Sequence, residues 1–138
     1  MELTLSTLSG WATITLISSA GLVPIVARLQ GKKRPPPDSL PTRTHVLLGL
    51  AVTVVCFLHT GVVLPNVGAP GAAAGGMIAM IPACIGFAML IAHAGLGLQL
   101  RNPKLKDRIK KRRMHTFTAT VIFLAACTHI VAIVTAPR

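Results

Sequence analysis

Four long apolar stretches divide this chain of 138 residues and limit what it can fold into. They run from about Leu8 to Leu29, Thr44 to Leu64, Met77 to Leu100, and Met114 to Ala136. Each has about 20 residues or slightly more, which is long enough for a helix to cross the hydrocarbon core of a bilayer. Irregular chain would leave backbone groups unsatisfied in lipid. The sequence therefore predicts an all-α integral membrane protein, with residues 1–138 forming a single up-down four-helix bundle.

The charged residues support this prediction and also suggest an orientation. Only 12% of the residues are charged, whereas a soluble domain has about 25%. Fourteen Lys and Arg oppose three acidic residues, and most of the basic residues lie in two loops, 28–43 and 101–113. Basic loops tend to stay in the cytoplasm, so both termini are expected on the outer side. A bacterial cytoplasmic membrane is the default location for such a chain.

The same charge distribution argues against a nucleic-acid partner. A nucleic-acid-binding surface typically combines basic side chains with exposed aromatic rings. This chain has no tyrosine, and its basic loops contain no aromatic residue. Membrane lipid is therefore the expected surroundings of the chain, and no nucleic acid is expected to bind it.

Two pairs of histidines repeat inside the apolar stretches. His45 and His59 are fourteen positions apart, as are His115 and His129, and 70 positions separate the two pairs. Fourteen residues make just under four helical turns, so both members of a pair project from one face, about 21 Å apart along the axis. The second and fourth stretches run in the same direction in the predicted topology. His45 is then expected opposite His115 near the cytoplasmic side, and His59 opposite His129 nearer the outer side.

Facing histidines at two depths suggest haem ligation. Ionisable side chains inside a membrane are costly and usually face the bundle interior, where they serve a function. Two opposed imidazoles can fill both axial positions of a haem iron. Zinc would favour four ligands gathered at one point, and no Asp or Glu lies within a predicted span. No Cys-x-x-Cys-His motif occurs, so the two expected haems are of the non-covalent b type.

On these residues the chain resembles the dihaem b-type transmembrane cytochromes. The resemblance is to the four-helix core of respiratory cytochrome b and to the transmembrane part of ferric reductases and NADPH oxidases. In those families a His, thirteen other residues and a second His recur on two co-oriented helices, as at His45/His59 and His115/His129 here. The resemblance covers the helices and the ligands, and it includes no flavin or nicotinamide domain. It implies a role in electron transfer.

Three arginines lie within three residues of a cytoplasmic-side histidine: Arg43, Arg112 and Arg113. Their positive charges can bind haem propionates. The alternative is that they only orient the chain and attract anionic lipid.

His93 stands outside the repeated pattern, in the third stretch. Three roles are open for it. It replaces His45 or His115 as a ligand, it binds or deprotonates a quinol near the cytoplasmic haem, or it forms a hydrogen bond to another helix.

The leading functional hypothesis is transmembrane electron transfer through two bis-histidine haems. The expected donor or acceptor is quinone, quinol or a redox protein partner. Two arrangements are open for the chain: a subunit of a larger redox complex, and a protein that acts alone. Whether it is an enzyme, for example a quinol- or superoxide-dependent oxidoreductase, stays open, and no catalytic residue is assigned. Two alternatives are a haem-containing membrane anchor for a soluble redox enzyme and a small proton-relay transporter.

Overall fold

The computed structural model describes residues 4–31, 36, 38–67 and 76–136, and they form helices and turns without any β-strand. The helices are α1 (Leu5–Leu29), α2 (Leu40–Val63), α3 (Gly76–Leu100) and α4 (Arg108–Val134), with a short 3₁₀ turn, η1 (Leu64–Asn66), after α2. All four α-helices are long and apolar enough to cross a membrane. The predicted all-helical membrane fold is therefore confirmed for the described residues.

All four helices begin earlier than the apolar pattern predicted, and the difference is largest for α2 and α4. α2 begins at Leu40 rather than Thr44, and α4 begins at Arg108 rather than Met114. Pro41 lies in the first turn of α2, where its missing N–H is not needed by the helix. Lys and Arg are good helix formers, so the basic run before Met114 continues the helix although it is not apolar. α1 ends at Leu29, and two residues later Gly31 has a φ of 66°, in the left-handed region that glycine adopts without strain.

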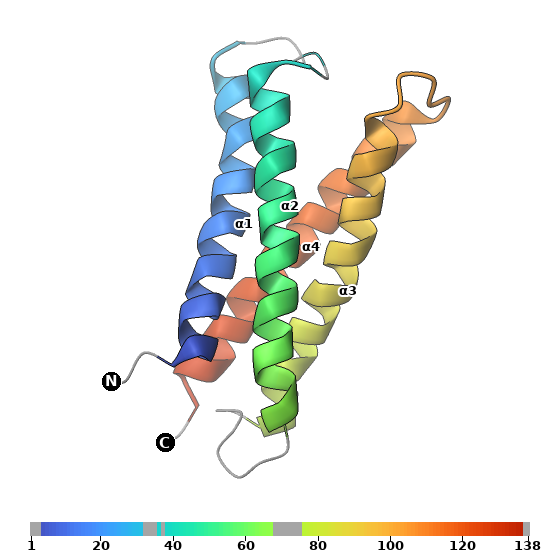
Figure 1. Ribbon diagram of the computed structural model, residues 1–138. Coiled ribbons are helices and arrows are strands. Elements are labelled where there is room, and N and C mark those ends of the chain that lie inside the picture. The colour runs from blue at the N-terminus through green and yellow to red at the C-terminus, as the bar shows by residue number, and fades with distance from the viewer. Residues whose placement is uncertain (1–3, 32–35, 37, 68–75, 137–138) are drawn as a thin grey trace.

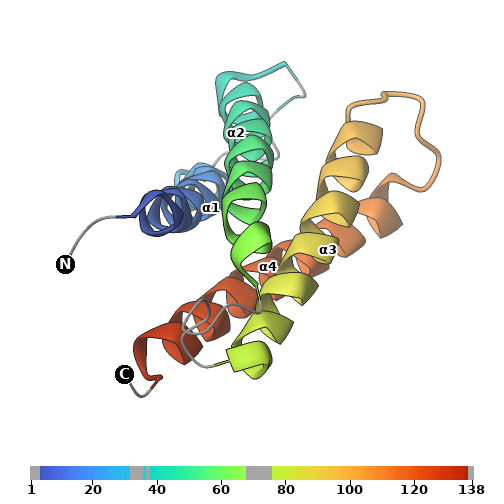
Figure 2. The ribbon, with the colours of Figure 1, turned by 60° about the horizontal axis from the view of Figure 1, so that its bottom comes forward.

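The helices form two hairpins. α1 packs against α2 and α3 against α4, while the contacts between the hairpins are fewer and join α2 to α3 and α1 to α4. The start of α1 and the end of α4 lie at one end of the bundle, and the hairpins separate toward the opposite end (Figures 1 and 2). α2 and α4 lie across the diagonal, with no direct backbone contact among the described residues. Contact between α2 and α4 therefore depends on their side chains or on a group bound between them.

The buried core lies between the two histidine levels and repeats the 70-residue offset. Its members, one from each helix, are Ala20, Val52, Leu90 and Ile122. Val52 is seven residues from both His45 and His59, and Ile122 is seven from both His115 and His129. The core therefore separates the two levels with apolar packing, and each hairpin contributes two residues at positions related by the repeat.

The outer surface of the bundle is apolar. Large hydrophobic side chains are more than half exposed along the helices, among them Leu22, Val54, Ile78 and Phe117. Lipid chains solvate such side chains, whereas water does not. The residues 32–35 and 37 of the first basic loop lie outside the described residues, so the structure adds nothing to that part of the loop prediction.

Candidate functional site

The structure brings His45 of α2 and His115 of α4 together across the diagonal. Their ring centroids are 6.1 Å apart, and the ring planes are inclined by 85°. This loop-side pair (His45 and His115) lies toward the end of the bundle where the hairpins separate. The other two, His59 of α2 and His129 of α4, form the terminus-side pair, for which no ring contact is found among the described residues.

The spacing of the loop-side pair suits two ligands on one metal atom. An imidazole nitrogen binds a first-row metal at about 2 Å, so the centres of two opposed rings lie about 6 Å apart. The 6.1 Å separation matches this value. His45 and His115 would therefore be the residues that hold a haem iron at this level.

In His45 and His129, hydrogen bonds determine which ring nitrogen keeps a lone pair that could bind a metal. His45 Nδ1 lies 2.9 Å from the carbonyl oxygen of Ala20, and His129 Nδ1 lies 2.9 Å from that of Ala79. A carbonyl oxygen only accepts, so each Nδ1 donates its hydrogen. In a neutral ring Nε2 then keeps its lone pair. Metal-ligating histidines usually donate from the second nitrogen in this way, which sets the ring orientation.

His59 reaches the same arrangement through a serine. Its Nδ1 lies 3.0 Å from Ser9 Oγ, and Ser9 Oγ lies 2.8 Å from the carbonyl oxygen of Leu5. The hydroxyl donates to that carbonyl, so its oxygen accepts from His59 Nδ1. Gly10 also touches this ring, because a Cβ at Gly10 would lie 3.3 Å from His59 Cε1. α1 thus provides the hydrogen-bond acceptor for His59 Nδ1, and its glycine at position 10 leaves room for the His59 ring.

His115 differs from the other three. Its Nδ1 is buried and has no hydrogen-bond partner in the described part of the chain. The ring of His93 stacks on it, with centroids 3.7 Å apart and planes inclined by 15°. His93 Nδ1 lies 2.9 Å from Thr118 Oγ1 and 3.1 Å from the carbonyl oxygen of His115. Of the three roles open for His93, the contact observed is the hydrogen bond to another helix.

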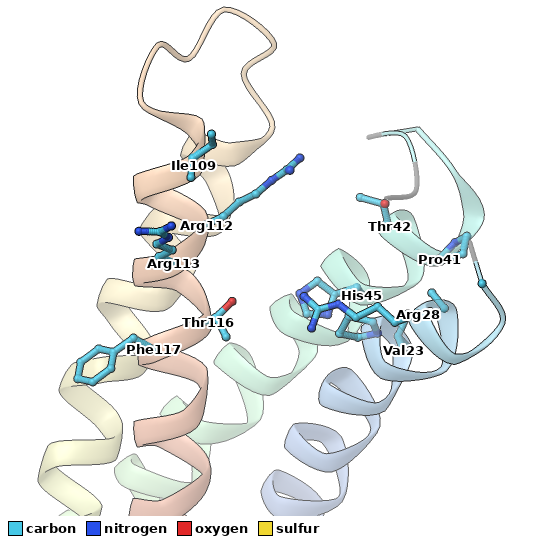
Figure 3. A pocket seen from close by; sticks show the side chains of 13 residues that line it. Val23, Arg28, Pro41, Thr42, His45, Ile109, Arg112, Arg113, Thr116 and Phe117 are labelled. Carbon is cyan, nitrogen blue, oxygen red and sulfur yellow. The ribbon is translucent and has the colours of Figure 1, made fainter. Parts of the chain in front are cut away.

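A cavity of about 950 Å³ opens beside His45, between the start of α4 and the α1–α2 hairpin, and His115 is not among the residues that line it (Figure 3). His45 lines it together with Arg28, Arg112 and Arg113. Arg112 extends from α4 toward the hairpin. Two of the three arginines expected near the propionates therefore reach this cavity. Arg43 is exposed and does not line it, because it projects from a different face of α2 than His45.

Sequence reasoning missed six contributors to the site: Ser9, Gly10, Arg28, Thr118 and the carbonyls of Ala20 and Ala79. One signal was present, because Ser9 and Ala79 are separated by the same 70 positions as the histidines they bind. Arg28 lies one residue before the end of the first apolar stretch and lines the same cavity as Arg112 and Arg113 of α4.

The four repeated histidines are spread over two levels and do not gather at one point. Among the described residues no group of three or more His, Cys, Asp or Glu could hold a metal ion. Two imidazoles per level are fewer than the four ligands that zinc favours. Comparison with protein-family models, with curated proteins and with solved structures found no match.

Proposed function

We propose that this protein is a dihaem b-type membrane cytochrome that carries electrons across the bilayer. The observation that supports it best is the 6.1 Å opposition of His45 and His115 on diagonal helices. In this proposal His45 and His115 hold one haem, and His59 and His129 hold the other. Each haem, when bound, supplies a centre that accepts and releases one electron.

In this proposal the rest of the bundle sets the distance between the two histidine levels and fills the space between them with apolar side chains. Fourteen residues of helix place the two levels about 21 Å apart along the axis, much of the hydrocarbon thickness. Val52 and Ile122 fill the space between the levels and are 4% and 6% exposed. If two histidines held each iron, oxygen would find no free position on it, which would favour electron transfer over oxygen activation.

The basic residues support an orientation and a place for the propionates. Arg28, Arg112 and Arg113 surround the cavity beside His45 and can pair with carboxylates. The positive-inside rule places this end in the cytoplasm of a bacterial cell. Quinone, quinol or a redox protein partner is the expected donor or acceptor, and a larger redox complex is compatible with the small size of the chain.

Electron transfer across vesicles tests this proposal. Purified protein is reconstituted into liposomes that contain ferricyanide, and dithionite is added outside. Each electron that crosses the membrane reduces one ferricyanide ion inside the liposome. The protein should accelerate this reduction, and His59→Ala or His115→Ala should each remove the acceleration. Thr128→Ala is a matched control beside a ligand, because its hydroxyl only bonds the Leu124 carbonyl of its own helix. A colourless protein that moves protons would contradict the proposal and favour the transporter.

A further inference from the structure

The carbonyl that bonds His45 lies one helical turn before a proline. Pro24 lies inside α1, and it lines the cavity beside His45. In an α-helix the carbonyl oxygen of Ala20 accepts a hydrogen bond from the N–H of residue 24. Proline has no N–H, so this helical bond cannot form. The Ala20 carbonyl is therefore left for a donor outside its own helical ladder.

His45 supplies that donor. Ala20 belongs to the buried core, and its carbonyl oxygen lies 2.9 Å from His45 Nδ1. A carbonyl without a partner is costly inside a membrane, and a proline within a spanning helix is tolerated where a neighbouring helix satisfies the freed group. The same bond places the hydrogen of a neutral His45 ring on Nδ1, so that Nε2 keeps its lone pair. One contact thus completes the hydrogen bonding of α1 and orients the ring.

The second hairpin provides an internal comparison. The 70-residue repeat pairs Ala20 with Leu90 and Pro24 with Ala94. Ala94 has the N–H that Pro24 lacks, and the α-helical pattern of α3 directs it to the Leu90 carbonyl. The histidine at the corresponding position, His115, has a buried Nδ1 without a partner among the described residues. The bond from histidine to carbonyl therefore occurs in the hairpin that has the proline, and it is missing from the hairpin that has alanine.

We propose that Pro24 is a positioning residue for the loop-side haem. Because it has no backbone N–H, it leaves the Ala20 carbonyl to His45 Nδ1 and so keeps His45 Nε2 as the nitrogen that faces the iron. The role toward haem rests on the proposed function. The orientation of the His45 ring by Pro24 does not depend on a bound haem, so the two can be tested separately.

Transfer of haem to an excess of apomyoglobin tests the role toward haem. The measurement uses the His59→Ala background, which should retain only the loop-side haem. In Pro24→Ala the new N–H competes with His45 for the Ala20 carbonyl, so the haem should leave about 10 times faster, the lower end of the effect of losing an outer partner. The lower end is expected because a carbonyl oxygen has two lone pairs and can keep part of the second bond. An unchanged rate would overturn the proposal.

Pro82→Ala is the matched control, because Pro82 also lies inside a helix, α3. Its missing N–H corresponds to the carbonyl of Ile78, whereas the carbonyl of α3 that bonds a repeated histidine is that of Ala79. This variant should leave the rate of transfer unchanged. An acceleration equal to that in Pro24→Ala would show a general effect of straightening a helix and would overturn the proposal.

An α-hydroxy acid in place of Pro24 separates the missing N–H from the proline ring. Lactic acid at this position puts an ester oxygen where the amide nitrogen was, so the chain has neither an N–H nor a ring there. The haem should then leave as slowly as it does with proline. Transfer as fast as in Pro24→Ala would show that the ring matters and that the missing N–H does not, which would overturn the proposal.

Nitrogen NMR of the full chain without haem tests the orientation of the ring. Isotope-labelled histidine distinguishes a hydrogen on Nδ1 from one on Nε2, and His45→Gln identifies the signals of His45. The unaltered protein should carry this hydrogen on Nδ1, and in Pro24→Ala a larger share should move to Nε2. Equal populations in the two proteins would overturn the proposal. Absence of haem from the unaltered protein would refute the proposed function, and the NMR result would still decide whether Pro24 orients His45.

Discussion

Ser9→Ala should weaken binding of the terminus-side haem selectively. Ser9 Oγ is the acceptor for His59 Nδ1 at 3.0 Å, and alanine leaves that donor without a partner. A half-buried donor that loses its acceptor costs about 1–3 kcal/mol. Loss of such an outer partner usually lowers metal affinity by about 10–100-fold, which corresponds to about 1.4–2.8 kcal/mol and agrees with that cost.

The assay is transfer of haem from the protein to an excess of apomyoglobin, followed optically. In Ser9→Ala one of two haems should leave about 10–100 times more readily, and the other should leave at the unaltered rate. Ser19→Ala is the matched control, because Ser19 Oγ bonds only the Thr15 carbonyl of its own helix. Equal behaviour of the two variants would refute the anchoring of His59 by Ser9.

Three other changes test separate parts of the structure. Gly10→Val should weaken the same haem in the same transfer assay, because even a Cβ at this position lies 3.3 Å from His59 Cε1, whereas Gly21→Val, with open space around its Cβ, should not. Ile122→Ala should lower the free energy of unfolding in detergent by about 2 kcal/mol, since its side chain is 6% exposed and leaves a cavity between the haem levels. Arg28→Gln should lower the affinity for the loop-side haem more than Arg43→Gln does, because Arg28 lines the cavity and Arg43 does not. Haem titration of the apoprotein measures both affinities.

The helices could be predicted from the sequence because a bilayer fixes both their length and their apolar character. The starts of α2 and α4 could not, because Leu40 to Arg43 and the basic run from Arg108 are helical but project beyond the apolar segments. Hydropathy identifies the residues that are favourable in lipid, but it does not detect helical residues that extend beyond the apolar segment.

The opposition of His45 and His115 followed from spacing and topology, since helical periodicity fixes which residues share a face. The acceptors of Nδ1 were not predictable in the same way. Every residue has a carbonyl, so the acceptor roles of Ala20 and Ala79 depend on how the neighbouring helix is rotated. The same rotation decides that Arg28 rather than Arg43 reaches the cavity, although both flank apolar segments.

Haem stoichiometry of the purified protein tests the account most directly. The pyridine haemochrome assay, combined with a reduced-minus-oxidised spectrum, should give two b haems per chain, one of which is lost in His59→Ala and the other in His115→Ala. A colourless preparation, or one whose haem content is the same in both variants as in the unaltered protein, would contradict the assignment of the four histidines as ligands.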